Sequence, residues 1–221
     1  MPTLSRMLDS IIKNIVVNVA FNISNPLHDK IVKISCEIRD KYNSSWYLDD
    51  KRFFLHMPVF LMATPERNRK EIIDAGMVYA KSLKVIPLKS KGLISSDNLV
   101  MIDFEDNKEL YNYHLKAIEI FNPLREGQVR NKYKEMKYLQ NLSVKNRDKV
   151  KIYGYTHVLE NFHPHITIAR LDSNSYREKV INLYNRQFEK SESQISRLQI
   201  HEAMFEPENK NVLLVDIELD R

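Results

Sequence analysis

The 221 residues are 43% hydrophobic and 29% charged, enough to bury the core of one compact domain or of two small lobes, and 34 basic against 29 acidic side chains give a net charge of +5. Four scattered glycines cannot form a phosphate-cradling loop or a dinucleotide-binding turn, and the G-x-S-x-G elbow of serine hydrolases does not occur. A single cysteine excludes an internal disulfide, and no apolar run is long enough to span a bilayer, so we expect a cytoplasmic monomer without a membrane partner.

Hydrophobic patterning divides the chain into strands and helices. In chain order it predicts a strand at 15–23, a helix at 26–42, a strand at 53–62, a helix opened by Thr64-Pro65, two or three short strands within 84–105, a helix at 108–122, a strand-rich stretch at 151–170, a helix at 173–190 and a terminal hairpin turning at Pro207 to Lys210. Asn25 and Asn107 are the expected caps of the first and third helices. The helix after Pro65 is expected to turn Ile73, Met77 and Ala80 inward. Because strands and helices do not alternate strictly, we expect an α+β fold rather than a doubly wound parallel sheet.

Residues 125–151 differ in composition from the rest of the chain. They hold nine lysines or arginines against three acids, and this difference of +6 leaves the remainder near −1. Val129, Tyr133 and Met136 indicate a partly helical segment with one apolar edge. Two interpretations stay open: a solvated insertion, or an electropositive rim that attracts a polyanionic substrate.

Two histidine segments carry the strongest chemical signal. Residues two apart in a strand point the same way, so His165 and Thr167 share one face of their strand while Ile166 and Ile168 share the other. The segment around His56 repeats this arrangement. The histidine lies opposite an apolar back face of Phe53, Leu55, Met57, Val59 and Leu61.

A pair of imidazoles is what metal-independent cleavage of a phosphodiester needs. One imidazole removes a proton from the attacking water or sugar hydroxyl, and the other donates a proton to the departing oxygen. Histidine can hold either role near neutral pH because its ordinary pKa lies close by. His56 and His165 are therefore the candidate catalytic pair. Thr167 is the candidate ligand for the phosphate, because a hydroxyl can stabilise charge that develops in the transition state.

The run PHITIAR at 164–170 resembles the second signature of the two-histidine (2H) phosphoesterase superfamily, which includes the 2′-5′ RNA ligase and RNA 2′,3′-cyclic phosphodiesterase proteins. The order of elements is also similar over most of the chain, so residues 1–221 are expected to form a single domain with a basic insertion at 125–151. The resemblance implies a bilobal fold in which two pseudo-symmetric lobes, each with an antiparallel sheet and outer helices, line a central cleft. It also implies an enzyme without metal or organic cofactor that acts on RNA or a small nucleotide, at a 2′,3′-cyclic phosphate or a 2′-5′ linkage.

The first histidine segment departs from the H-x-[ST] pattern of that superfamily, because Pro58 stands where a serine or threonine is expected. Proline has neither a hydroxyl nor a backbone N–H, and it predicts a bulge or an edge strand. The loss of one charge-assisted hydrogen bond to phosphate costs about 1.5–3 kcal/mol, or roughly ten- to a hundredfold in rate. The alternative function is therefore a nucleotide- or RNA-binding protein with the same cleft but impaired catalysis.

Other interpretations stay open near the second histidine. His163 and His165 have an H-x-H spacing that can bind zinc in a hydrolase, although no nearby cysteine or H-x-x-x-H pattern supplies a third ligand. Arg170 can neutralise substrate charge or form a surface ion pair. Tyr155 and Phe162 can stack on a base or pack in the core.

The remaining histidines singled out in the sequence have no pattern of their own. His114, His157 and His201 are expected to be incidental to the site.

Overall fold

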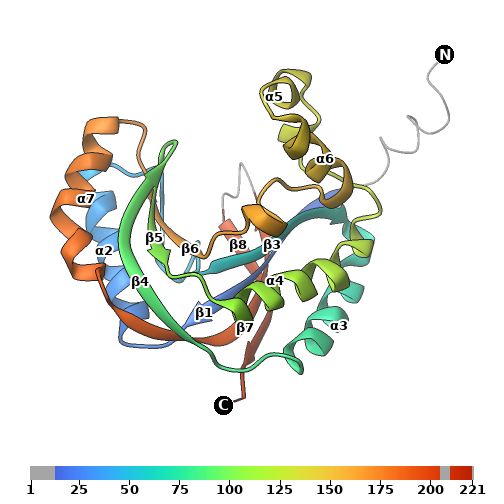
Figure 1. Cartoon of the computed structure of the whole chain (residues 1–221), viewed down its shortest axis with the longest axis horizontal. Helices are drawn as coiled ribbons and strands as arrows, with labels where there is room; N and C mark the ends of the chain where they lie inside the picture. The colour runs from blue at the N-terminus through green and yellow to red at the C-terminus, as the bar shows by residue number, and fades with distance from the viewer. Residues whose placement is uncertain (1–12, 205–209, 221) are drawn as a thin grey trace.

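The computed structural model describes residues 13–204 and 210–220 (Figure 1). Its strands form one strongly curved antiparallel sheet in the order β2-β6-β5-β4-β7-β1-β3, with β8 paired to β7. The strands are β1 (Asn14–Ile23), β2 (Trp46–Tyr47), β3 (Met57–Pro65), β4 (Pro87–Ser96), β5 (Leu99–Phe104), β6 (His165–Arg170), β7 (Glu192–Met204) and β8 (Lys210–Glu218). The α-helices are α2 (Leu27–Tyr42), α3 (Arg69–Ala80), α4 (Lys108–Phe121), α5 (Met136–Gln140), α6 (Val144–Tyr153) and α7 (Asn174–Phe188). Among the described residues no helix has the length and apolar character needed to cross a bilayer.

The sheet consists of two halves, each with its own helices. One half contains β3, β1, β7 and β8, and α3 and α4 pack against it; the other contains β2, β6, β5 and β4, and α2 and α7 pack against it (Figure 1). The halves are joined where Pro87–Lys89 of β4 pairs with Glu192–Gln194 of β7. We call these halves the first lobe and the second lobe. The α+β, two-lobed architecture expected from the sequence is confirmed.

Hydrophobic periodicity accounts for most of these elements. The predicted inward positions Ile15, Val17, Val19, Phe21 and Ile23 are all buried along β1. Helix α2 buries Leu27, Ile31, Ile34 and Ile38. Asn107 caps α4 as predicted, because its side chain accepts hydrogen bonds from the backbone N–H groups of Glu109 and Leu110. The predicted cap at Asn25 is wrong: the residue before α2 is Pro26, and no side chain caps the helix.

The predicted inner face of α3 is partly confirmed, because Ile73 and Ala80 are half-buried against the core but Met77 is exposed. Residues 66–68 form a 3₁₀ turn, so the helix begins four residues after Pro65 and buries Ile72, Gly76 and Tyr79, while Met77 is 51% exposed. Gly76 lies where the helix approaches the sheet. A β-carbon at this position would lie 2.6 Å from Cδ1 of Ile200, so any larger residue would require that side chain to move.

Two strand predictions extend too far. Of the stretch 151–170, only 165–170 is a strand, and residues 151–153 belong to α6. The first histidine strand begins at Met57 rather than near 53, so His56 lies just before it. The terminal hairpin of β7 and β8 is confirmed, although residues 207–209 of its expected turn lie outside the described residues.

The basic stretch forms a helical arm that stands away from the two lobes (Figure 1). We define the arm as residues 126–153. Arg125 closes its base: the guanidinium is 2% exposed and donates hydrogen bonds to the carbonyls of Gln128 and Ile152 and to Oδ1 of Asn122. Arg125 thus joins the two ends of the arm and adds little to its surface charge, and Lys149 is likewise buried.

Gly154 should be sensitive to substitution because it lies against this buried guanidinium. Its φ is +68°, and an added β-carbon would lie 2.5 Å from Nε of Arg125. Gly127 is the matched control, since its φ is +77° but nothing lies within 4 Å of an added β-carbon. Gly127→Ala should therefore cost only the backbone strain, about 1–2 kcal/mol, and Gly154→Ala should cost clearly more in urea unfolding. Equal losses in the two variants would contradict the role of Arg125 as the clamp of the arm.

Candidate functional site

The two histidines are held in the same way by the backbone that precedes them. Nδ1 of His56 lies 2.7 Å from the carbonyl oxygen of Phe54, and Nδ1 of His165 lies 2.8 Å from that of His163. A carbonyl oxygen only accepts hydrogen bonds, so Nδ1 carries the proton in both rings. Nε2 of each neutral ring is therefore available to accept a proton.

Both histidine strands contain a β-bulge at the same distance from the histidine. In the second lobe, successive residues of β5 pair with Ala169 and Thr167, and Ile168 is skipped. Ile168 and Ala169 are consequently both buried, and the alternation resumes with Arg170 exposed. The bulge therefore returns Arg170 to the face that carries His165 and Thr167.

The first lobe has the equivalent bulge. Successive residues of β1 pair with Phe60 and Pro58, and Val59 is skipped. β3 is also the edge strand of its half of the sheet. Pro58 thus lies at both a bulge and a sheet edge, as the sequence predicted.

The two bulges make the lobes comparable residue by residue. The second lobe presents His165, Thr167 and Arg170 on one face, and the corresponding positions of the first lobe hold His56, Pro58 and Leu61. The hydroxyl and the cation therefore occur on one side only.

A small hollow lies between the start of β3 and the start of β6. It is narrow, with a free volume of about 10 Å³, roughly the space of one water molecule, and it is lined by Pro58, Val59, Tyr155, His157, Phe162, His163 and His165. The sequence-predicted residues His165, Tyr155 and Phe162 are thus brought together here. His56 is not among the lining residues, but it is within electrostatic reach of His165, whose positive charge lowers the pKa of His56.

Both histidines favour the neutral form. Burial is the main cause that lowers the pKa of His56, while its hydrogen bond to the Phe54 carbonyl opposes it. Burial also lowers the pKa of His165, with a further contribution from the charge of His163, whereas the His163 carbonyl and Asp103 oppose it. A positive charge on His165 further disfavours protonation of His56, so a proton on His165 favours the neutral form of His56.

Asp103 is a site residue that the sequence analysis missed. It lies on β5 directly opposite His165. Its carboxylate contacts Nε2 of His163 at 2.8 Å and Nζ of Lys91 at 3.0 Å. The signal was present in the sequence, since Asp103 alternates with the apolar core residues of its strand.

His201 is a second missed residue. It lies on β7, is fully buried, and neither of its ring nitrogens has a hydrogen-bond partner. Its ring stacks on Phe54 at 5.4 Å and packs against His56 at 5.6 Å. Trp46 contacts His56 edge-on at 6.4 Å, so aromatic rings enclose the first catalytic candidate.

His114 is structural rather than incidental. Its Nδ1 donates to the carbonyl of Val59, the bulge residue of β3, and its Nε2 accepts from the backbone N–H of Leu159. Its ring stacks on Phe162 at 4.2 Å. One side of Phe162 therefore packs in the interior, and the ring also lines the hollow.

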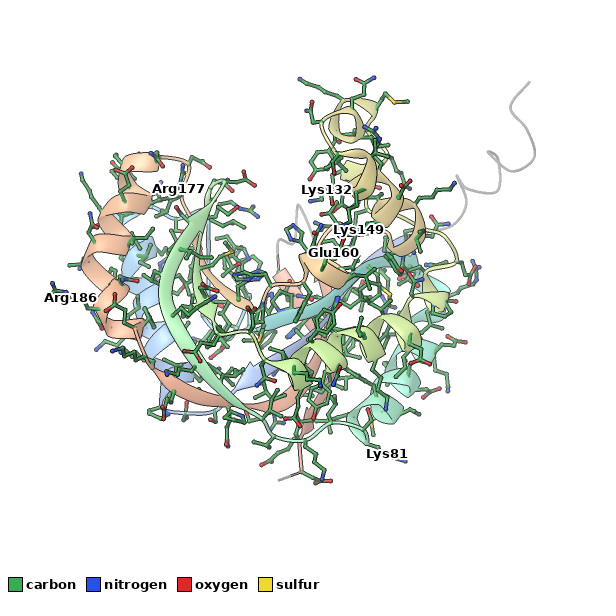
Figure 2. The ribbon with its side chains drawn as sticks, viewed as in Figure 1. Lys81, Lys132, Lys149, Glu160, Arg177 and Arg186 are labelled. Atoms are coloured by element: carbon green, nitrogen blue, oxygen red, sulfur yellow. The ribbon has the colours of Figure 1, made fainter. Side chains whose placement is uncertain are left out.

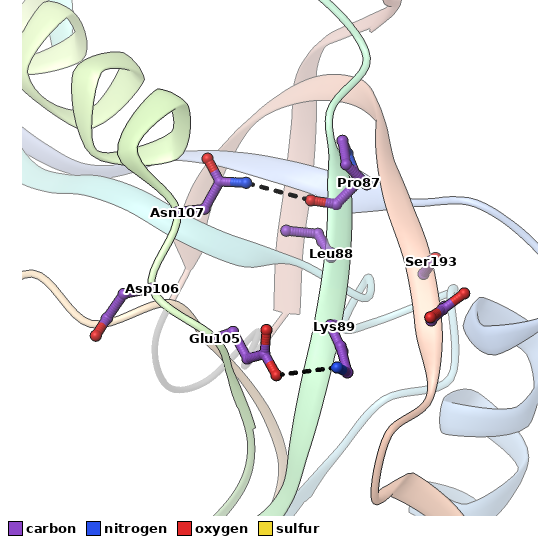
Figure 3. Close-up of a pocket in the computed structure, with 8 residues that line it drawn as sticks. Pro87, Leu88, Lys89, Glu105, Asp106, Asn107 and Ser193 are labelled. Atoms are coloured by element: carbon purple, nitrogen blue, oxygen red, sulfur yellow. Dashed lines mark hydrogen bonds and ion pairs between the residues drawn. The ribbon is translucent and has the colours of Figure 1, made fainter.

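Two larger hollows, of about 390 and 430 Å³, lie away from the paired histidines. One is at the joint between β4 and β7 and is lined by Lys89, Glu105 and Asn107 among others (Figure 3). The other is lined by Lys108, Tyr111, Phe162 and Pro164 among others.

Within residues 13–204 and 210–220, no group of three or more histidine, cysteine, aspartate or glutamate side chains could hold a metal ion.

Known proteins with the same fold were found by structural comparison. The protein TT0787 of Thermus thermophilus matches with a TM-score of 0.60 at 12% identity, over 92% of this chain and 97% of that chain. LigT of E. coli in apo form matches with a TM-score of 0.52 at 11% identity, over 95% of this chain and 99% of that chain. LigT complexed with ATP matches with a TM-score of 0.50 at 11% identity, over 95% of this chain and all of that chain. The chain therefore shares its fold with LigT and TT0787 along almost its whole length.

Sequence comparison links the chain to a family whose activity is not described. The model of the family "Protein of unknown function (DUF1045)" matches residues 55–212, a span that includes both candidate histidines. No curated protein matches the sequence.

His201 makes the stability of the protein sensitive to acid. Burial lowers its pKa to about 3, so between pH 6.5 and 3 the unfolded chain binds a proton that the folded protein does not. Above pH 6.5 the ring is neutral in both states, and protonation does not reduce the free energy of unfolding. As the pH falls below 6.5 the unfolded chain gains a proton, and at pH 4.5 the free energy of unfolding is lower by roughly 2–3 kcal/mol. His201→Phe should remove this part of the loss when urea unfolding is compared at pH 7 and pH 4.5. An unchanged acid sensitivity would show that the ring is solvated.

Proposed function

This chain belongs to the family described as "Protein of unknown function (DUF1045)", and we propose that it is a metal-independent phosphodiesterase in which His56 and His165 act as the acid–base pair. One observation carries the proposal. The two imidazoles occupy equivalent positions in the two lobes and have the same Nδ1–carbonyl hydrogen bond, and the charge of His165, which lines the hollow, acts on His56.

The surroundings of the two rings favour different roles. His165 lies near Asp103, whose negative charge favours the protonated ring, so we assign His165 as the general acid. His56 is enclosed by the rings of Trp46 and His201, which favour the neutral form, so we assign it as the general base.

The reaction follows from these assignments. With a 2′,3′-cyclic phosphate, Nε2 of His56 takes a proton from water, the water oxygen bonds to phosphorus, and one phosphorus–ribose oxygen bond breaks. His165 gives its proton to the departing ribose oxygen. With a 2′-5′ linkage, the neighbouring 3′-hydroxyl replaces water and leaves a cyclic phosphate, and the 5′-oxygen receives the proton. No metal or organic cofactor is needed for either step.

Thr167 and Arg170 are the proposed ligands of the phosphate. They follow His165 on the same face of β6, so a hydroxyl and a guanidinium can hold the non-bridging oxygens while the proton moves. Tyr155 and Phe162 offer ring faces for the base or sugar at the edge of the hollow. The solved complexes of LigT with ATP and with 3′-AMP support a nucleotide as the substrate class of this fold.

The direct test is turnover in EDTA of nucleoside 2′,3′-cyclic phosphates and of 2′-5′-linked dinucleotides. His56→Ala and His165→Ala should each lower kcat/KM by about 10²–10⁴-fold, because each removes one proton-transfer group. His28→Ala is the control, since His28 lies outside the hollow beside Asp50. Full turnover by either catalytic variant would end the acid–base assignment.

A second substrate separates acid from base. In a nucleoside 2′-(4-nitrophenyl phosphate), 4-nitrophenolate departs without protonation, whereas the attacking 3′-hydroxyl still needs a base. His165→Ala should therefore lose much less activity on this ester than on the 2′-5′-linked dinucleotide, and His56→Ala should lose activity on both. The reverse pattern would exchange the two roles.

The second candidate function is a nucleotide- or RNA-binding protein with impaired catalysis. The apolar pair Pro58 and Leu61, opposite Thr167 and Arg170, favours it because the phosphate would be held from one lobe only. Pro58→Thr would restore the missing hydroxyl, and we expect it to raise kcat by roughly tenfold. Efficient turnover by the wild-type protein, with no gain in Pro58→Thr, would exclude this second function.

A further inference from the structure

The arm carries two cations close to the hollow. Arg130 directly precedes the 3₁₀ turn Asn131–Tyr133, and Lys132 lies within this turn. Nζ of Lys132 lies 4.9 Å from the ring centroid of Tyr133 and 5.2 Å from that of Tyr138. The ammonium group is therefore positioned against two aromatic rings rather than moving freely in solvent. Lys132 lies farther out along the arm than Lys149 and Glu160 (Figure 2).

Both cations act on residues that line the hollow. The positive charges of Lys132 and Arg130 lower the pKa of His157, which burial and His165 lower as well. Arg130 also acts electrostatically on Tyr155, whose ring packs against His157 at 5.3 Å. His157 and Tyr155 both line the hollow beside His165. Geometry links the arm to the hollow as well: Lys132 lies against the ring of Tyr133, whose hydroxyl is 3.3 Å from Oγ1 of Thr156, the residue between Tyr155 and His157.

These two cations differ from Lys145 and Lys149, the basic residues of the arm whose charge a carboxylate compensates. Lys145 and Lys149 share the carboxylate of Glu160, at 2.6 and 2.9 Å. In the part of the chain that the structure describes, neither Arg130 nor Lys132 forms an ion pair with a carboxylate.

The positive charge of Lys132 is only partly balanced by nearby negative charge. Burial and the neighbouring charge of Arg130 lower its pKa to about 8, and only Asp97, in the turn between β4 and β5, opposes this. Two half-buried cations that repel each other would be stabilised by an anion between them.

We propose that Arg130 and Lys132 form a subsite for a second phosphate group of the substrate, adjacent to the hollow that holds the scissile one. The substrate class is then a nucleotide or oligonucleotide that carries a phosphate beyond the one cleaved. This inference rests on the proposed function for the placement of the scissile phosphate. Arg130 binds through its planar guanidinium, and Lys132 as a point charge supported by the rings of Tyr133 and Tyr138.

The test compares two substrates with the same reacting group: adenosine 2′,3′-cyclic phosphate and its 5′-phosphorylated form. The wild-type protein should prefer the 5′-phosphorylated form by about tenfold or more in kcat/KM, because it gains charge-assisted hydrogen bonds. Arg130→Gln and Lys132→Gln should each bring this preference close to unity, because they lose far more activity on the 5′-phosphorylated substrate than on the unphosphorylated one. Lys132→Arg should keep the preference, since the positive charge remains.

Three controls sharpen this comparison. Lys134→Gln removes an exposed charge of the same segment and should have no effect, which distinguishes a local subsite from general attraction. Asp97→Asn should increase the preference, because it removes the carboxylate that competes for Lys132. Glutamine keeps the aliphatic stem over Tyr133 and Tyr138, and unchanged melting temperatures would show that the variants fold.

Binding without turnover tests the subsite independently of the reaction. By titration calorimetry, adenosine 3′,5′-bisphosphate should bind about tenfold more tightly than adenosine 3′-phosphate, and Lys132→Gln should abolish the difference. If neither cyclic substrate is cleaved but this difference is found, the proposed function fails and the subsite stands. If both cyclic substrates are cleaved equally well by the wild-type protein and the variants, the subsite fails and the proposed function stands. Equal affinities in calorimetry would also overturn the subsite.

Discussion

The arrangement of the site depends on a short antiparallel contact, in which Pro87–Lys89 of β4 pairs with Glu192–Gln194 of β7. This contact joins two half-sheets whose histidine strands, β3 and β6, lie far apart in the order of the sheet. Only strong curvature of the joined sheet can bring those strands toward one hollow, and the curvature is plain in Figure 1. Side chains reinforce the joint, since Asn107 donates to the carbonyl of Pro87 and Lys89 lies 3.5 Å from Glu105 (Figure 3).

Each half of the sheet orients its candidate catalytic histidine by the same local backbone arrangement. A histidine hydrogen-bonds the carbonyl two residues earlier, and a bulge three residues later reverses the alternation of the strand. The first bulge leaves the carbonyl of Val59 outside the ladder with β1, and His114 satisfies it. Because His114 also accepts from Leu159, it links the first lobe to the loop that leads into β6. A histidine without any sequence pattern thus helps to position both halves of the site.

The sequence predicted what depends on local patterning and missed what depends on packing between distant segments. Alternation in PHITIAR placed His165 and Thr167 on one face, and Pro58 indicated the bulge and the edge strand. The bulge in β6 could not be predicted, so the shared face of Arg170 followed from the structure alone. Similarly, the close approach of Gly76 to Ile200 and the contact of His201 with His56 join residues far apart in the chain. Such pairs have no signature in the spacing of residues.

The two lobes contribute unequally to phosphate binding, and this inequality explains why positive charge on the arm would matter. A phosphate between the lobes would meet a hydroxyl and a guanidinium from Thr167 and Arg170 but only apolar groups from Pro58 and Leu61. Its negative charge would therefore be compensated from one side, which weakens both binding and alignment for in-line attack. Arg130 and Lys132 supply positive charge from a third direction, and the clamp at Arg125 fixes the base of the segment that carries them. A substrate held at two phosphates stays better aligned even though the first lobe contributes no polar contact to the scissile one. The missing hydroxyl at Pro58 and the two cations of the arm are therefore parts of one explanation.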